Sequence, residues 1–148
     1  MREAGQIERL SIRSDPGRIR DARRWISEIV GRGGWEASDA RDLALALSEA
    51  CSNAHRYAYG GRKDGRIDVR LELWPSRIEI AVRDYGIGFD ASSYRGPDLS
   101  RPREGGYGIH LMKQLTDHVE HRAKEAGTLV VMIKTRRPQA QAGARGGI

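Results

Sequence analysis

The sequence predicts an α/β two-layer sandwich, in which helices cover one face of a mixed, largely antiparallel sheet. Two pairs of strand-like runs are each joined by a short turn, and such connections make antiparallel hairpins. The helical segments are grouped and do not alternate with the strands, which argues against a doubly wound parallel sheet. A chain of 148 residues with 39% apolar content has room for one compact domain. We expect that domain in residues 1–135 and a disordered, low-complexity tail in residues 136–148.

The first part of the chain predicts one strand and two helices. Residues 7–12, IERLSI, form a short strand-like run. Ser14 or Asp15 can cap a helix at Pro16, in which apolar residues recur at helical spacing: Ile19, Ala22, Ile26, Ile29 and Val30. Ser38 or Asp39 can cap a second helix, whose buried stripe is expected to comprise Leu43, Ala46, Leu47, Ala50, Ala54 and Tyr57.

The second part predicts two hairpins and one helix. Residues 66–74 and 77–84 alternate apolar and polar side chains on either side of Pro75 and Ser76. Residues 109–117 form a third, short helix, and strands in residues 118–123 and 128–135 turn near Gly127. Between these parts, residues 84–108 are rich in Gly, Pro, Ser and charge. A long irregular stretch in a compact domain is usually functional or disordered, and its functional form would be a lid over a ligand.

Charge and cysteine content narrow the possible classes of protein. The formal charge of +6 would suit nucleic acid, an anionic membrane or a phosphate ligand, but the arginines are scattered among acids. We see no recognition helix or aromatic platform for nucleic acid. Cys51 is the one cysteine, which rules out a disulfide framework. No apolar run is long enough to span a membrane and no signal peptide is visible, so we expect a cytoplasmic protein.

One cluster of like charge stands out on the first predicted helix. It comprises four arginines, namely Arg18, Arg20, Arg23 and Arg24. This cluster is a candidate for docking an acidic partner, and ordinary solvated charge explains it equally well.

Three short motifs could carry chemistry, and each alone is weak. Glu49 and Asn53 stand one helical turn apart in LSEACSNA, a spacing that is common on solvated helix faces. Asp84, Gly86 and Gly88 follow an apolar strand in RDYGIGFD, where an ordinary turn would also want glycine. The third motif, GGYGIHL, precedes or opens a helix and consists of Gly105, Gly106, Tyr107 and Gly108.

Together and in this order, the motifs suit a nucleotide. Asp84 can accept a hydrogen bond from an exocyclic amine such as that of adenine, and nearby glycines let a flat base approach the backbone. A glycine-rich helix N-terminus favours phosphate. Asn53 offers a neutral oxygen to Mg²⁺, which takes its other ligands from phosphate and water. Glu49 would then be the base that receives a proton from the attacking hydroxyl or water.

With the motifs in this order, the sequence resembles the Bergerat-fold ATPases, the GHKL group that includes gyrase, Hsp90, histidine kinases and MutL. A closer resemblance is to the anti-sigma factor serine/threonine protein kinases of bacterial partner switching. The residues that carry it lie in three segments, LSEACSNA, VRDYGIGFD and GGYGIHLMKQLTDHVE. The resemblance covers about residues 5–135. It implies Asn53 as the magnesium ligand, Glu49 as the catalytic base and Asp84 as the adenine-binding acid. The nucleotide-binding glycines that it implies are Gly86, Gly88, Gly106 and Gly108.

The resemblance also implies an activity and partners. Members of that family use ATP to phosphorylate a serine or threonine of a small STAS-domain antagonist, and they sequester a sigma factor or another regulator, usually as homodimers. The alternative is a regulatory module that binds ATP but has lost phosphoryl transfer.

Two departures from the family pattern keep that alternative open. Tyr57 stands where the family often has His, and Glu104 stands where many members have an Arg that reaches the terminal phosphate. Arg103, one position earlier, is our candidate to replace that arginine, because a cation there would stabilise the transferring phosphoryl group.

Overall fold

The computed structural model describes residues 5–86 and 104–136. Its strands are β1 (Gln6–Arg13), β2 (Arg66–Leu73), β3 (Arg77–Asp84), β4 (His118–Ala123) and β5 (Thr128–Thr135). Its helices are α1 (Pro16–Arg32), α2 (Ala37–Asn53) and α3 (Glu104–Leu115), and a π-helical turn, η1 (Ala54–Ala58), continues α2. No helix among these residues is long and apolar enough to cross a membrane.

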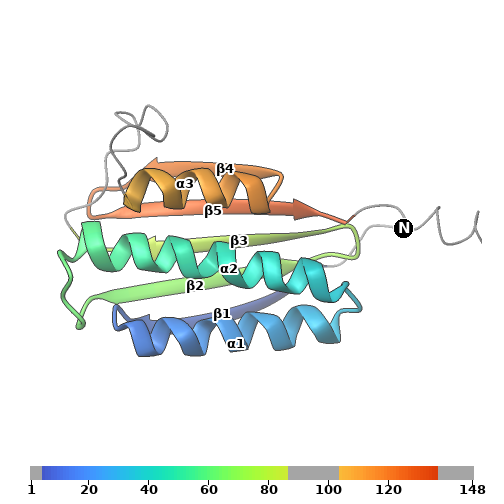
Figure 1. The fold of residues 1–148 in the computed structure, drawn as a ribbon. Helices are drawn as coiled ribbons and strands as arrows, with labels where there is room; N and C mark the ends of the chain where they lie inside the picture. The colour runs from blue at the N-terminus through green and yellow to red at the C-terminus, as the bar shows by residue number, and fades with distance from the viewer. Residues whose placement is uncertain (1–4, 87–103, 137–148) are drawn as a thin grey trace, which may run out of the picture.

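The strands form one sheet in the order β1-β2-β3-β5-β4, with the helices packed on one face (Figure 1). This confirms the predicted two-layer α/β class. Every pairing between the described strands is antiparallel. The prediction of a mixed, largely antiparallel sheet is therefore correct for the antiparallel pairs, and the described strands contain no parallel pair. Trp74 and Arg77 exchange two backbone hydrogen bonds of 2.8 and 3.3 Å around Pro75 and Ser76, which closes the predicted β2-β3 hairpin.

The α1 helix begins where a capping side chain is available. The Asp15 carboxylate accepts a hydrogen bond of 2.9 Å from the Gly17 N–H, so Asp15 is the cap. Ser14, the alternative cap, is buried instead, where its hydroxyl donates to the Arg62 carbonyl at 2.6 Å and accepts from the Gly65 N–H at 2.9 Å. The five apolar residues that we expected to share one face of α1 are all buried.

The predicted cap of α2 was wrong. The helix begins at Ala37, so Ser38 and Asp39 lie inside its first turn and neither caps it. The Asp39 carboxylate lies 3.8 Å from the Lys134 ammonium, on the neighbouring β5 strand. A negative charge in the first turn also interacts favourably with the helix dipole.

The predicted stripe of α2 is correct as far as Ala54 and wrong at Tyr57. Leu43, Ala46, Leu47, Ala50 and Ala54 are buried, whereas Tyr57 is 39% exposed. The π-helical turn begins at Ala54, and its wider winding rotates the residues that follow relative to an α-helix. As a result, Ala58 and Tyr59 turn inward in place of Tyr57.

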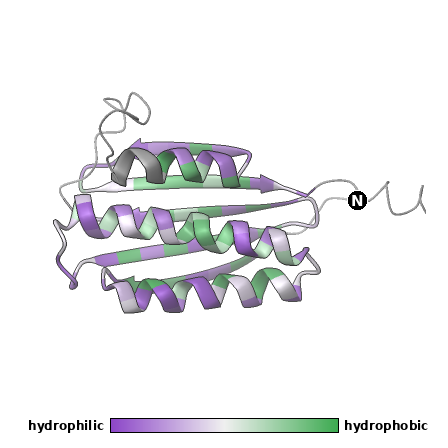
Figure 2. Cartoon of the chain, in the orientation of Figure 1, coloured by the Kyte–Doolittle hydropathy of each residue, from purple (hydrophilic) through white to green (hydrophobic). Residues whose placement is uncertain are grey.

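The core lies between the sheet and the helices and is made by residues of both layers, as Figure 2 shows by the hydrophobic bands along strands and helices. Cys51 is fully buried in it, and burial raises the pKa of its thiol to about 12. Arg136, which we had assigned to the tail, belongs to the described fold. Its N–H donates to the Ser76 carbonyl at 2.7 Å, and its guanidinium lies 4.3 Å from the centre of the Trp35 ring. The rest of the tail lies outside the described residues.

Candidate nucleotide site

The ends of α2, β3 and η1 and the start of α3 meet at one end of the sheet (Figure 1). The described parts of all three sequence motifs lie on these segments or directly after them. Glu49 and Asn53 come from the last turns of α2, Asp84 is the last residue of β3, and Gly86 follows it. Gly88 and Arg103 lie outside the described residues. The fold therefore brings the described parts of the three motifs to the same end of the molecule.

The side chain of Asn53 is unusual in its hydrogen bonding. It is the last residue of α2, and its Oδ1 atom is buried without a hydrogen-bond partner among the described residues. A buried polar atom that lacks a partner costs free energy, so native proteins rarely keep one without a use. Glu49 is half-buried one turn earlier on the same helix. The helix thus offers one vacant amide oxygen and one carboxylate side by side.

Asp84 is a buried acid, only 7% exposed. Burial raises the pKa of its carboxyl group, while hydrogen bonds from the Gly86 and Thr128 N–H groups and the charge of Arg83 oppose this effect. The bond from Gly86 measures 3.3 Å. Two backbone donors hold the carboxylate in place, and its remaining lone pairs can accept from a ligand.

Two glycines allow the backbone to close around Asp84. A Cβ atom at Gly86 would overlap the Ala58 carbonyl, and one at Gly127 would overlap the Asp84 backbone. Gly127 also has a φ of +81°, which favours glycine. The turn before β5 is therefore pressed against the end of β3, and any side chain on it would displace Asp84.

Tyr59 joins three segments of the site. Its hydroxyl donates to the Arg66 carbonyl at 2.5 Å and accepts from the Tyr85 N–H at 2.8 Å, between Asp84 and Gly86. Its ring covers Gly65, where a Cβ atom would overlap the ring. Tyr59 thus fixes the residues after Asp84 relative to η1, which continues the helix of Asn53.

The third motif differs from its prediction in where the helix starts. The α3 helix begins at Glu104 and not at residue 109, so Gly105, Gly106, Tyr107 and Gly108 form its first turns. The first four N–H groups of an α-helix have no partner within the helix. The glycine-rich motif therefore supplies backbone donors from inside the helix, beside the C-terminal end of α2 (Figure 1).

Gly127→Ala is expected to lower the free energy of unfolding by about 2 to 5 kcal/mol, because positive φ and steric overlap both penalise the methyl group. Gly34→Ala is the matched control, since Gly34 has a φ of +78° but nothing within 4 Å of its Cβ position. That control should lose about 1 to 2 kcal/mol, from the backbone conformation alone. Urea denaturation of both variants measures the difference, and equal losses would mean that the contact with Asp84 carries no cost.

Comparison with known proteins shows the family of this chain. The family model described as the histidine kinase-like ATPase domain matches residues 12–134. A protein named Serine-protein kinase RsbW from Bacillus pumilus is 34% identical over 144 residues, which cover 90% of this chain and 88% of that protein. The chain belongs to the RsbW family of histidine kinase-like ATPase domains. An RsbW protein from Bacillus subtilis is 31% identical over 133 residues, 84% of this chain and 82% of that protein.

Solved structures agree with the fold. The RsbU and RsbW domains of a Mycobacterium tuberculosis protein match 90% of this chain with a TM-score of 0.67 at 19% identity, and this chain spans 33% of that one. A histidine kinase domain from Erythrobacter litoralis matches 87% of this chain with a TM-score of 0.54 at 19% identity, and this chain spans 63% of that one.

Membership of the RsbW family confirms the predicted family, the enzyme class of protein serine kinase and ATP as the nucleotide. The sequence reading missed three residues that shape the site, namely Tyr59, Gly127 and Thr128. Gly127 was seen only as a turn. The signal for the other two was weak, because a tyrosine after a helix and a threonine at a strand start are common.

Proposed function

We propose that this chain uses Mg²⁺ and ATP to phosphorylate a serine or threonine of a STAS-domain antagonist, and that it sequesters a sigma factor or another regulator as a homodimer. The observation that carries the proposal is the vacant, buried Asn53 Oδ1 atom, one helical turn from Glu49. Membership of the RsbW family supports the same reading.

The residues present fit a magnesium ion held mainly by its substrate. Mg²⁺ prefers oxygen ligands and usually keeps several waters and phosphate oxygens. Asn53 Oδ1 is an oxygen of this kind, and its lack of a partner in the described part of the chain fits an atom that binds an ion. The described residues contain no cluster of three His, Cys, Asp or Glu side chains that could hold a metal unaided. Bound at Asn53, the ion would neutralise charge on the phosphates during transfer.

Each remaining residue has one task in this mechanism. Asp84 accepts a hydrogen bond from the exocyclic amine of adenine, and the N-terminal turn of α3 binds phosphate oxygens through its free N–H groups. Glu49 accepts the proton of the substrate hydroxyl while the hydroxyl oxygen attacks the γ-phosphorus. The bond between that phosphorus and the β-γ bridging oxygen then breaks and releases ADP.

A shallow pocket between α1 and α2 fits the docking of an acidic partner close to this site. Its volume is about 420 Å³, and its lining includes Arg20 and Arg23 from α1 and Ser48 and Ser52 from α2. Ser48 and Ser52 directly precede Glu49 and Asn53 in the sequence. Two of the four arginines in the predicted cluster thus face a surface next to the proposed catalytic helix.

The alternative function is a regulatory module that binds ATP without phosphoryl transfer. It is favoured by one observation, that Glu104 occupies the place of the family's phosphate-contacting arginine. Glu104 begins α3, and our candidate replacement, Arg103, lies just outside the described residues.

Two measurements test the proposal and separate it from the alternative. Calorimetric titration with ATP and ADP, with and without Mg²⁺, should give binding that depends on magnesium. Incubation with labelled ATP and a STAS-domain antagonist should then label that protein. Binding without labelling would favour the regulatory module, and the absence of binding by folded protein would reject both functions.

Asp84→Asn is expected to weaken ATP binding by about 10- to 100-fold, because a charged acceptor for the adenine amine is lost. GTP binding should change little. Lowering the pH through the raised pKa of Asp84 should weaken ATP binding in the wild type and not in the variant. Calorimetry at several pH values measures this, with the exposed Asp64→Asn as control. Equal losses for ATP and GTP would contradict base recognition.

The same substitution should stabilise the free protein. An aspartate whose pKa is higher in the folded chain than in the unfolded chain lowers the free energy of unfolding as the pH rises through the folded pKa. Asp84 is such a residue, because burial raises its pKa. Asp84→Asn removes this penalty, so its melting temperature at neutral pH should exceed that of the wild type.

A further inference from the structure

The β1 strand is an edge of the described sheet and pairs only with β2 there. The Ser14 N–H bonds to the Gly65 carbonyl at 2.7 Å, which continues the register that places Arg13 opposite Arg66. Hydrogen-bonded and non-bonded pairs alternate along an antiparallel ladder. Even-numbered residues of β1 therefore bond to β2, and the unpaired N–H and C=O groups that point outward belong to Ile7, Arg9, Ser11 and Arg13.

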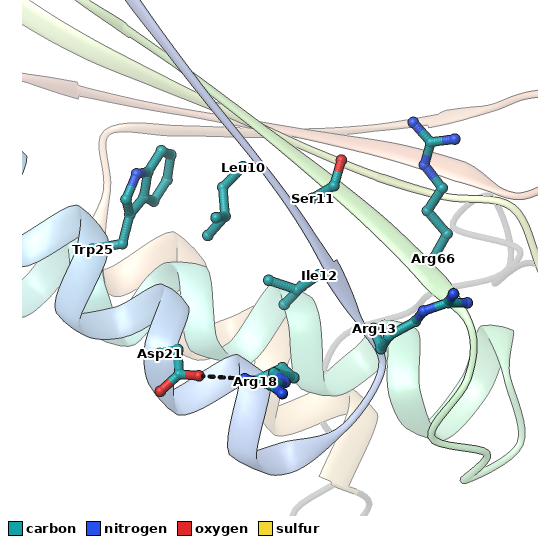
Figure 3. A pocket seen from close by; sticks show the side chains of 8 residues that line it. All are labelled: Leu10, Ser11, Ile12, Arg13, Arg18, Asp21, Trp25 and Arg66. Atoms are coloured by element: carbon teal, nitrogen blue, oxygen red, sulfur yellow. Dashed lines mark hydrogen bonds and ion pairs between the residues drawn. The ribbon is translucent and has the colours of Figure 1, made fainter.

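A groove of about 720 Å³ runs beside this edge, between β1 and α1 (Figure 3). Leu10 and Ile12 from β1 and Trp25 from α1 form its apolar side. All three are only half-buried and pack against the margin of the core. An added strand beside β1 would cover them, because its side chains on the helix-facing side would meet Leu10 and Ile12.

The polar part of the groove is basic. Among its lining residues are three arginines, Arg13, Arg18 and Arg66, and a single carboxylate, Asp21. Asp21 pairs with Arg18 at 3.3 Å, and Arg66 pairs with Asp68 of β2 at 2.9 Å. Arg13 donates to the backbone carbonyl of Asp64 at 3.1 Å and has no carboxylate partner in the described structure.

We propose that this groove binds an extended, acidic segment of another protein, which adds a strand to β1. Outward backbone groups would provide the pairing, and apolar side chains would cover Leu10, Ile12 and Trp25. Carboxylates on the other side would meet Arg13. The interaction requires no nucleotide, and it goes beyond the proposed kinase function.

A second copy of the chain is a poorer occupant. Symmetric antiparallel pairing of two β1 edges must match outward residues with outward residues. Centring that pairing on Arg9 places Arg9 opposite its own copy, and centring it on Ser11 places Arg9 opposite Arg13. Centring on Leu10 places arginines opposite Ser11 and Ile7. Within Gln6–Arg13, no such register brings a carboxylate opposite an arginine, and facing like charges destabilise a sheet.

The chain's own C-terminal segment is not complementary either. Residues 137–148 contain Arg137 and Arg145 and no acidic side chain. Charge therefore favours another protein over this C-terminal segment and over a second copy of the chain.

The test uses a short, end-capped peptide that alternates valine and glutamate, added to the full-length protein without nucleotide. Chemical shifts of backbone amides should change at Arg9, Ser11 and Arg13 and at the Trp25 indole, and calorimetry should give a dissociation constant. A peptide with lysine in place of glutamate should bind at least about tenfold more weakly. No binding, or equal binding of both peptides, would overturn the proposal.

Two variants locate the binding. Arg9→Pro removes one outward N–H and should weaken the peptide complex, whereas its control, Arg9→Ala, keeps that donor. Arg13→Glu reverses a charge in the groove and should weaken binding about tenfold, while Arg32→Glu at the far end of α1 should not. If Arg9→Pro fails to fold, the Arg13 comparison still decides. Conversion of a dimer to a monomer by Arg9→Pro would place a second copy at β1 and reject the acidic partner.

Discussion

Glu49→Gln is expected to retain ATP binding and to slow phosphorylation of the protein substrate by about 10²- to 10⁴-fold. An amide of the same shape cannot accept the hydroxyl proton, and general-base catalysis typically contributes a factor of this size. Single-turnover transfer from labelled ATP, combined with calorimetric titration of ATP, separates the chemical step from binding.

The Glu49 experiment has a matched control and a clear contrary outcome. Glu28→Gln makes the same chemical change on the exposed side of α1 and should leave transfer unchanged. A Glu49→Gln enzyme with wild-type transfer would remove Glu49 as the base. A variant that loses ATP binding as well would instead place Glu49 among the residues that hold the nucleotide or its ion.

Asn53→Ala is expected to weaken magnesium-dependent ATP binding by about 10- to 100-fold, since one ion ligand is lost. In the free protein the same change should raise the melting temperature slightly. It deletes a buried oxygen that has no described partner, and alanine is the better helix former. Calorimetry with and without Mg²⁺ and thermal unfolding measure the two effects.

The opposite signs of these two effects make the Asn53 experiment informative. Ser52→Ala, at the neighbouring half-buried position, should change the magnesium dependence of ATP binding and the melting temperature less than Asn53→Ala does. A destabilised Asn53→Ala protein would show that the side chain supports the fold. Unchanged magnesium dependence would exclude Asn53 as an ion ligand.

The regular elements of this fold could be predicted because their patterns depend on neighbouring residues alone. Buried residues alternate strictly with more exposed ones along β2 and β3, and the five apolar residues of α1 are all buried as expected. The same local reasoning failed at Tyr57. The sequence pattern does not distinguish a π-helical turn from an α-helix. The wider turn depends on how the end of α2 packs against the strands.

The position of the candidate site residues in the fold could be predicted, and the residues that support them could not. Asp84 and Asn53 belong to motifs with a chemical rationale at fixed spacing. Tyr59 and Gly127 act through segments distant in the chain: the Tyr59 hydroxyl reaches Tyr85, and Gly127 lies against Asp84. Such contacts arise only once β3, β5 and η1 are brought together, so the sequence pattern around each residue contains no sign of them.

The burial of Cys51 has a practical consequence for following motion in this protein. It lies on α2 between Glu49 and Asn53 and is the chain's one cysteine. With a thiol pKa of about 12, almost none of it is thiolate at neutral pH, and its burial keeps modifying reagents away. Its rate of modification therefore reports how often α2 separates from the core. Modification of Cys51 in the native chain can therefore measure how often the helix on which the proposed chemistry depends opens.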